Sequence, residues 1–148
     1  MMDPAGQRSA DTSFAGDAIR IPMFGRRPLQ ISGEKLLALE ESEAGTTLSL
    51  DLYLTEGDQP FLVLSRRDGE ALPLALLACP VTGREEACAQ LGAVDVTASE
   101  PLDPALLTEA PLPSVLAAHA DLATRIDRSR RMIDAMSAIA FGAHAVRS

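Results

Sequence analysis

The stretch Leu48-Ser-Leu-Asp-Leu-Tyr-Leu-Thr55 decides the fold, because leucine alternates with a more polar residue throughout. A period of two places every second side chain on the same face of a β-strand. The pattern predicts a strand with one face in the core and one toward solvent, as in an antiparallel sheet. Turn residues at 56–60 and an apolar run at 61–65 complete a predicted hairpin.

Further strands are predicted on both sides of this hairpin. Toward the N-terminus, apolar residues alternate at 19–21 and again at 29–32. We also assign 34–43 to a strand, although a short helix is the alternative, because a meander fits its neighbours better. Toward the C-terminus, 72–78 is apolar and contains Pro73, which indicates an edge strand.

The period of the pattern changes after the last predicted strand. Thr82 and Glu85 match a capping box, which predicts a helix that ends at Gly92. Asp103-Pro104 predicts the start of a second, short helix. From Ser114 onward, apolar residues recur at spacings of four and three, which predicts a long last helix with an apolar seam along one side. The seam is weak in its middle, where it contains Ser129. At about 1.5 Å per residue this helix outruns a small domain, so it either bends near Ser129 or reaches another chain.

Strands followed by helices predict an α+β fold: an N-terminal antiparallel β-meander of four or five strands, then C-terminal helices, the last one long. The 148 residues suffice for one domain with its own core. Residues 1–17 carry little apolar surface and are predicted to be a disordered arm. Residues 18–148 are predicted to be a single domain, with the sheet in 18–80 and the helices in 81–148.

The composition disfavours several classes of function. The net charge is −8, which disfavours a general binder of phosphate backbones. Aromatic residues make up 3% of the chain, which disfavours a stacking platform for single-stranded nucleic acid and a sugar-binding cleft. The first residues contain no apolar stretch of signal-peptide length, so we expect a cytoplasmic protein with reduced cysteines.

Candidate chemistry is sparse. Cys79 comes just before the helix predicted from Thr82, where a helix N-terminus would favour a reactive thiolate; core packing is the alternative. Two cysteines and two histidines match the ligand number of zinc, but their spacing contains no close ligand pair. The isolated glycines match no phosphate-binding loop. We therefore expect neither a metal nor a cofactor.

Three arginine pairs are candidates for contact with phosphate or for ion pairs with the acidic region 34–58, which holds seven acids: Arg26-Arg27, Arg66-Arg67 and Arg130-Arg131. Two of the pairs fall at predicted turns, where solvated charges are usual. The adjacent acids Glu40-Glu41 and Glu85-Glu86 form no carboxylate dyad on their own, because neighbouring residues do not share a face.

The last helix carries the strongest functional signal. Residues 132–146 are apolar on nearly all sides and must be buried on nearly all sides. The chain's own sheet or a second protein would cover them, and contact with a membrane surface is a further alternative because arginines precede the run. The candidate interface residues are Ile126, Ile133, Met136, Ile139, Ala140 and Ala143.

These features predict a non-enzymatic, acidic binding or assembly protein, of the adaptor or chaperone kind, that docks on a protein partner or forms a homodimer through its C-terminal helix. One alternative is a small enzyme that uses Cys79 or a carboxylate in a cleft of the sheet. The other is a nucleic-acid accessory protein that uses the arginine pairs.

Overall fold

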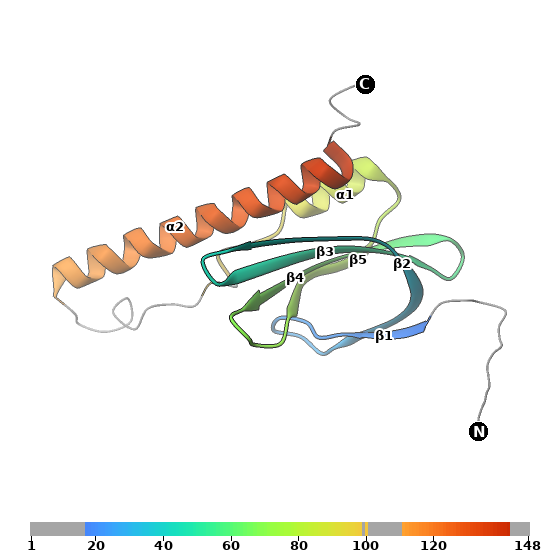
Figure 1. The fold of residues 1–148 in the computed structure, drawn as a ribbon, viewed down its shortest axis with the longest axis horizontal. Helices are drawn as coiled ribbons and strands as arrows, with labels where there is room; N and C mark the ends of the chain where they lie inside the picture. The colour runs from blue at the N-terminus through green and yellow to red at the C-terminus, as the bar shows by residue number, and fades with distance from the viewer. Residues whose placement is uncertain (1–16, 99, 101–110, 143–148) are drawn as a thin grey trace.

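A computed structural model describes residues 17–98, 100 and 111–142 of the chain. It contains five strands: β1 (Asp17–Ile21), β2 (Leu29–Glu43), β3 (Thr46–Thr55), β4 (Gln59–Asp68) and β5 (Leu74–Pro80). Helices α1 (Arg84–Gly92) and α2 (Leu112–Ser137) follow, and the π-helical turn η2 (Ala138–Gly142) continues α2. The strands form an antiparallel sheet in chain order, and the helices lie over one face of it (Figure 1). The α+β fold with an N-terminal meander and a long last helix is therefore confirmed.

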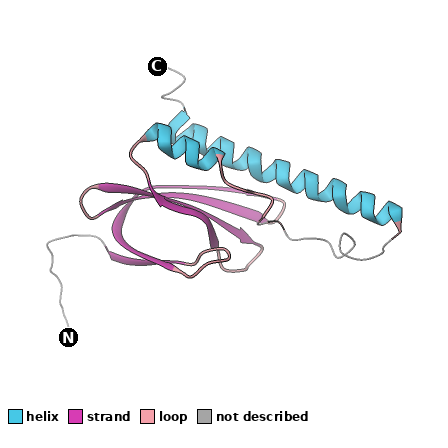
Figure 2. Ribbon diagram, turned by 180° about the vertical axis from the view of Figure 1, so that it is seen from behind, coloured by secondary structure: helices cyan, strands magenta, loops and turns pink. Residues whose placement is uncertain are grey.

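The β2 strand bends, so that its first part and its second part lie in two different layers of the fold. Its register against β3 shifts between Lys35 and Leu37, which marks a β-bulge. The part before the bulge pairs with β1 and curls below the sheet, on the side away from the helices (Figure 2). Gly33 lies in this part, and a Cβ at Gly33 would come within 2.6 Å of the carbonyl oxygen of Leu54. The close approach of the two strands thus requires glycine there.

Each face of the sheet has an apolar core. The core under the helices includes the predicted face of the central hairpin, together with buried residues of both helices. Its fully buried large side chains are Leu48, Leu50, Leu62, Leu64, Leu91, Ile133 and Met136. The core below the sheet is smaller and is covered by β1 and the start of β2. Its buried side chains are Ile21, Tyr53, Val63 and Ala75.

Several element boundaries differ from the sequence-based prediction. Helix α1 begins at Arg84 and shows no capping box; Thr82 bonds Glu86 instead of Glu85, through both its amide and its hydroxyl. Helix α2 begins at Leu112 and not at Ser114, because proline is tolerated in the first helical turn. The helix predicted from Asp103 lies outside the described residues.

The predicted disordered arm lies outside the described residues except for Asp17, which begins β1. Helix α2 is continuous through Ser129 and runs straight over its length (Figure 1), so the predicted alternative of a bend near Ser129 is wrong. Among the described helices, none combines the length and the apolar character needed to cross a membrane.

Candidate functional site

The N-terminal half of α2 extends past the sheet (Figures 1 and 2). The 26 residues of α2 span about 39 Å at 1.5 Å per residue, against about 33 Å for each of the ten-residue central strands β3 and β4. Leu112 and Leu116 lie one turn apart on this half and are 67% and 58% exposed. Adjacent turns of a helix place such residues on one flank. The helix thus presents a leucine pair to solvent where the sheet does not cover it.

The C-terminal half of α2 packs on the chain's own sheet, and this half together with η2 contains five of the six interface residues predicted from the sequence. Ile133 and Met136 are each 1% exposed and belong to the core under the helices. Ile126 and Ala140 are half-buried against the same core. A partner would reach these side chains only if α2 left the sheet. Ile139, by contrast, is 62% exposed. Ala143 lies outside the described residues.

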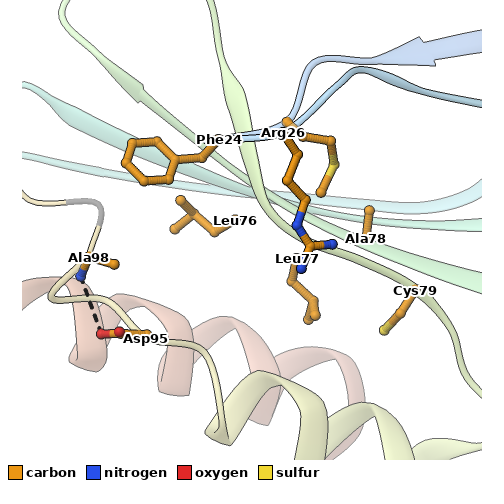
Figure 3. Close-up of a pocket in the computed structure, with 9 residues that line it drawn as sticks. Phe24, Arg26, Leu76, Leu77, Ala78, Cys79, Asp95 and Ala98 are labelled. Atoms are coloured by element: carbon orange, nitrogen blue, oxygen red, sulfur yellow. Dashed lines mark hydrogen bonds between the residues drawn. The ribbon is translucent and has the colours of Figure 1, made fainter.

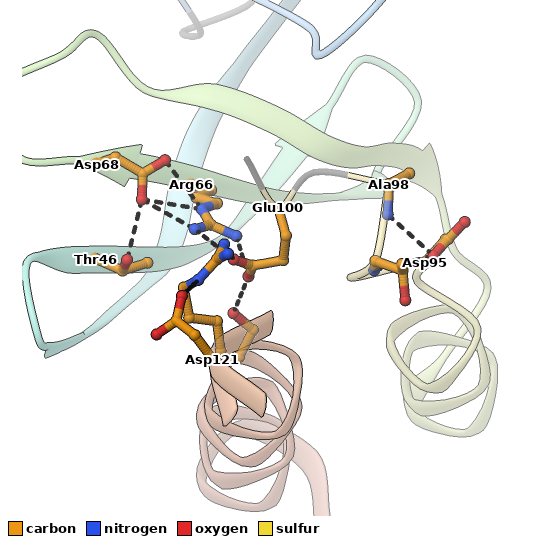
Figure 4. Close-up of polar contacts among 10 residues, drawn as sticks. Thr46, Arg66, Asp68, Asp95, Ala98, Glu100 and Asp121 are labelled. Carbon is orange, nitrogen blue, oxygen red and sulfur yellow. Dashed lines mark hydrogen bonds and ion pairs between the residues drawn. The ribbon is translucent and has the colours of Figure 1, made fainter. Parts of the chain in front are cut away.

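A buried charged cluster joins β4, α2 and the segment after α1. The Glu100 carboxylate is fully buried and accepts hydrogen bonds from Arg66 Nη2 (3.2 Å), Arg125 Nη1 (2.9 Å) and Ser129 Oγ (3.0 Å) (Figure 4). Arg66 Nη2 also contacts Asp68 Oδ1 at 3.0 Å. Because buried charges need several partners, this arrangement fixes the segment at Glu100 between the sheet and the long helix.

The charges of this cluster shift the protonation of its members. Burial by itself raises the pKa of Glu100, but the hydrogen bonds from Arg66 and Ser129, with the charge of Arg66, outweigh burial and hold that pKa below its ordinary value. For Arg66, burial lowers the pKa, and the bonds to Glu100 and Asp68 more than compensate and raise it. Both groups are therefore charged at neutral pH, and the cluster serves to hold structure.

Sequence reasoning missed this cluster. Glu100 lies in a polar stretch without any local pattern, and its partners are far away in the chain. The one sequence feature that pointed to the cluster was Ser129, a polar residue on the apolar seam of the last helix. In the structure its hydroxyl donates a hydrogen bond to Glu100. A polar residue on a buried helix face requires such a hydrogen bond.

The arginine pairs do not form one basic surface. Arg66 belongs to the buried cluster, and Arg130 donates to the carbonyls of Leu91 (2.7 Å) and Val94 (3.3 Å) at the end of α1. Arg131 lies 3.9 Å from Glu43, the last residue of β2. The members that serve internal contacts are thus unavailable to a nucleic acid.

A second candidate site is a pocket of about 350 Å³ beside β5. Its lining residues come from the turn after β1, from β5 and from the segment after α1: Met23, Phe24, Arg26, Leu76, Leu77, Ala78, Cys79, Asp95 and Ala98 (Figure 3). The Asp95 carboxylate is engaged by the amides of Thr97 and Ala98, at 3.0 and 3.2 Å. Arg26 has no ion-pair partner in the part of the chain that the structure describes.

Cys79 lines this pocket and is half-buried, as a free thiol. Burial, and to a lesser extent the charge of Glu86, raises the pKa of Cys79. A raised pKa reduces the thiolate fraction at neutral pH, which is the opposite of what a nucleophile needs. Cys88 is also a free thiol, and its sulfur lies 3.8 Å from the Ser137 hydroxyl.

Asp51 is the sheet carboxylate whose environment comes nearest to that of a general acid. Burial raises its pKa, and the Lys35 ammonium, 3.5 Å away, opposes the increase. Lys35 also lies 5.6 Å from the centre of the Tyr53 ring. Among the described residues, no group of three or more His, Cys, Asp or Glu side chains is placed to hold a metal ion.

No protein-family model matches the chain, and no curated protein or solved structure is significantly similar to it.

Proposed function

We propose that this chain is a non-enzymatic binding protein that self-associates through the N-terminal half of α2. The observation that carries the proposal is the exposure of Leu112 and Leu116 on a helical segment that extends past the sheet. Burying a leucine side chain is worth about 1.5–3 kcal/mol, so covering both leucines would favour association. The last helix also carried the interface predicted from the sequence; the proposal places the contact nearer its N-terminus.

A second copy of the chain fits this surface because the surface is uncharged. Residues 112–120 contain no Asp, Glu, Lys or Arg, and His119 is counted as neutral in the net charge of −8 of the whole chain. Two copies that meet along this segment would keep most of their like charges apart. A two-fold axis across the segment would pack the leucine pair of one copy against that of the other.

We also propose a cytoplasmic location. Cys79 and Cys88 are free thiols, which is the usual state of cysteines in a reducing compartment.

Sedimentation velocity over a range of protein concentrations tests the proposed association. We expect the wild-type chain to approach the mass of a dimer as its concentration rises and Leu116→Glu to remain monomeric. Ala117→Glu is the matched control, because it adds the same charge at the neighbouring exposed position and should leave the dimer intact. A wild-type chain that stays monomeric at every concentration contradicts the proposal.

A further variant separates the two ends of the helix. If Ile139→Glu dissociates the dimer while Leu116→Glu does not, the contact lies at the C-terminal end of the helix and the proposed surface is wrong. Circular dichroism of each variant establishes that its fold is retained.

A further inference from the structure

The outer edge of β5 is paired at one point. Ala75 donates its amide to the carbonyl of Pro22 (2.7 Å) and accepts a hydrogen bond from the amide of Phe24 (2.9 Å). The pairing is parallel and isolated, and Gly25, with φ +71, follows it directly in the turn between β1 and β2. Beyond Ala75, the β5 edge therefore has no strand neighbour among the described residues.

The backbone of Ala78 faces this open side. Pro80 is paired with Phe61, and the amide of Val81 donates to the carbonyl of Pro60 at 3.0 Å. In an antiparallel ladder, hydrogen-bonded and non-hydrogen-bonded pairs alternate. Since Val81 is hydrogen-bonded to Pro60, the alternation makes Cys79 and Leu62 the next hydrogen-bonded pair and leaves Ala78 and Val63 as a non-hydrogen-bonded pair. The amide and the carbonyl of Ala78 therefore point away from β4. An exposed strand edge of this kind is a template for pairing with another chain.

The pocket beside β5 lies along this open edge, and it offers both an apolar surface and a cation (Figure 3). Phe24, 42% exposed, and Leu76 supply the apolar surface. The Arg26 guanidinium supplies the cation, and within the described chain no carboxylate neutralises it. A strand edge, an apolar slot and an unpaired arginine together fit an extended, acidic peptide.

We propose that the open edge of β5 binds an extended peptide of a partner protein by strand addition. The peptide backbone pairs with the amide and carbonyl of Ala78, an apolar side chain lies against Phe24 and Leu76, and a carboxylate of the peptide pairs with Arg26. This site is separate from the α2 surface, and its test is independent of self-association.

A second copy of the chain fits this edge less well than a peptide does. The β5 strand, LALLACP, carries no acid, so pairing two β5 edges would leave Arg26 of each copy without a carboxylate from the added strand. The charge of Arg26 thus favours an acidic segment of a different protein.

The first experiment selects peptides of about ten residues from a display library on the full-length protein, since strands are typically up to that length. We expect the selected sequences to alternate apolar and polar residues and to include Asp or Glu. The binding of one synthetic, fluorescein-labelled peptide is then measured by fluorescence anisotropy. Arg26→Glu should weaken its binding about tenfold, whereas Arg27→Glu, the adjacent exposed arginine outside the pocket lining, should have little effect.

The second experiment tests the backbone contact. The selected peptide is N-methylated at one position at a time, and methylation at the position that donates to the carbonyl of Ala78 should weaken binding about tenfold. Ala78→Pro removes the outward amide of the strand and should have a similar effect; proline is tolerated on edge strands. If Ala78→Pro fails to fold, the binding of the N-methylated peptides to the wild-type protein tests the backbone contact by itself.

Amide chemical shifts locate the peptide on the protein. We expect the largest changes at 75–79. Failure to select any peptide, binding that no N-methylation weakens, or shift changes confined to 112–120 would each overturn strand addition at β5. None of these results bears on the mass measured for Leu116→Glu, so the two proposals fail separately.

Discussion

The hydroxyl of Ser129 on α2 donates a hydrogen bond to the buried carboxylate of Glu100 over 3.0 Å. Arg66 of β4 contacts the same carboxylate, so one side chain joins the long helix to the sheet. Removing a buried carboxylate with these partners is strongly destabilising, because the charges of its partners then stay uncompensated in the interior.

Replacing Glu100 by glutamine should destabilise the protein by about 3 kcal/mol at neutral pH, because Arg66 then loses its buried charged partner. Urea denaturation followed by circular dichroism measures this loss. Asp68→Asn is the comparison within the same cluster; the Asp68 side chain is 49% exposed, so its loss should cost less. Equal stability of Glu100→Gln and wild type would contradict the role assigned to the cluster.

The Glu100 cluster also predicts a dependence of stability on pH. Because the folded protein holds the pKa of Glu100 below the ordinary value of 4.5, the stabilisation is fully present above that value and is lost as the pH falls through the folded pKa. The difference in unfolding free energy between wild type and Glu100→Gln should therefore be constant near neutral pH and shrink below about pH 4.5. Urea titrations of both proteins between pH 3 and pH 7 measure this difference, which should change by ~1 kcal/mol per pH unit where Glu100 titrates.

Ile133→Asp should prevent folding, because Ile133 is 1% exposed in the core under the helices and a carboxylate there would have no solvent. The milder Ile133→Ala should remain folded with a loss of about 2–5 kcal/mol. Ile139→Asp is the control, since its side chain is 62% exposed and should tolerate the charge. The yield of soluble protein and the melting temperature distinguish them; normal melting of Ile133→Asp would place Ile133 outside the core.

Gly33→Ala should destabilise the protein by about 1–3 kcal/mol, because the new Cβ would overlap the carbonyl oxygen of Leu54. Gly92→Ala provides the opposite case. Gly92 ends α1, and a Cβ added there would meet nothing within 4 Å, so alanine should be neutral or stabilising by up to about 1 kcal/mol. The melting temperature should fall for Gly33→Ala and stay the same or rise for Gly92→Ala; an unchanged melting temperature of Gly33→Ala would count against the close approach at Gly33.

Arg130→Ala should cost about 1 kcal/mol, because Arg130 satisfies the carbonyls of Leu91 and Val94 after α1. Hydrogen exchange of the amides at 92–94 should become faster, since the end of α1 would open more often. Arg131→Ala is the neighbouring control: its side chain is 58% exposed and pairs with Asp127 within one helical turn, so exchange at α1 should not change.

The sequence was sufficient for the parts of the fold that depend on local patterns. The alternation through 48–55 predicted β3, and the turn at 56–60 predicted the hairpin with β4. The length of the last helix implied that it outruns a small domain, and α2 extends past the sheet (Figure 1). Each of these inferences uses the regular geometry of one element, which neighbouring residues determine.

The parts that sequence reasoning missed depend on residues that are distant in the chain. The bulge after Lys35 bends β2 beneath the sheet, and nothing in its leucine-rich pattern marks which residue is extra. Glu100 resembles a surface acid until Arg66 and Arg125 are placed around it. The interface prediction assumed that a terminal helix lacks cover, whereas the sheet and α1 bury Ile133.

The chain order of the meander has a consequence for synthesis on the ribosome. Every strand pairs with its neighbour in the sequence, so the sheet can form from short loops soon after Asp68 is made. The helix that covers its apolar face comes later, and at about 5–20 residues per second the chain from Asp68 to Met136 takes about 3–14 s to synthesise. During that interval the nascent sheet exposes Leu48, Leu50, Leu62 and Leu64, which makes it a target for chaperones and for aggregation until α2 emerges.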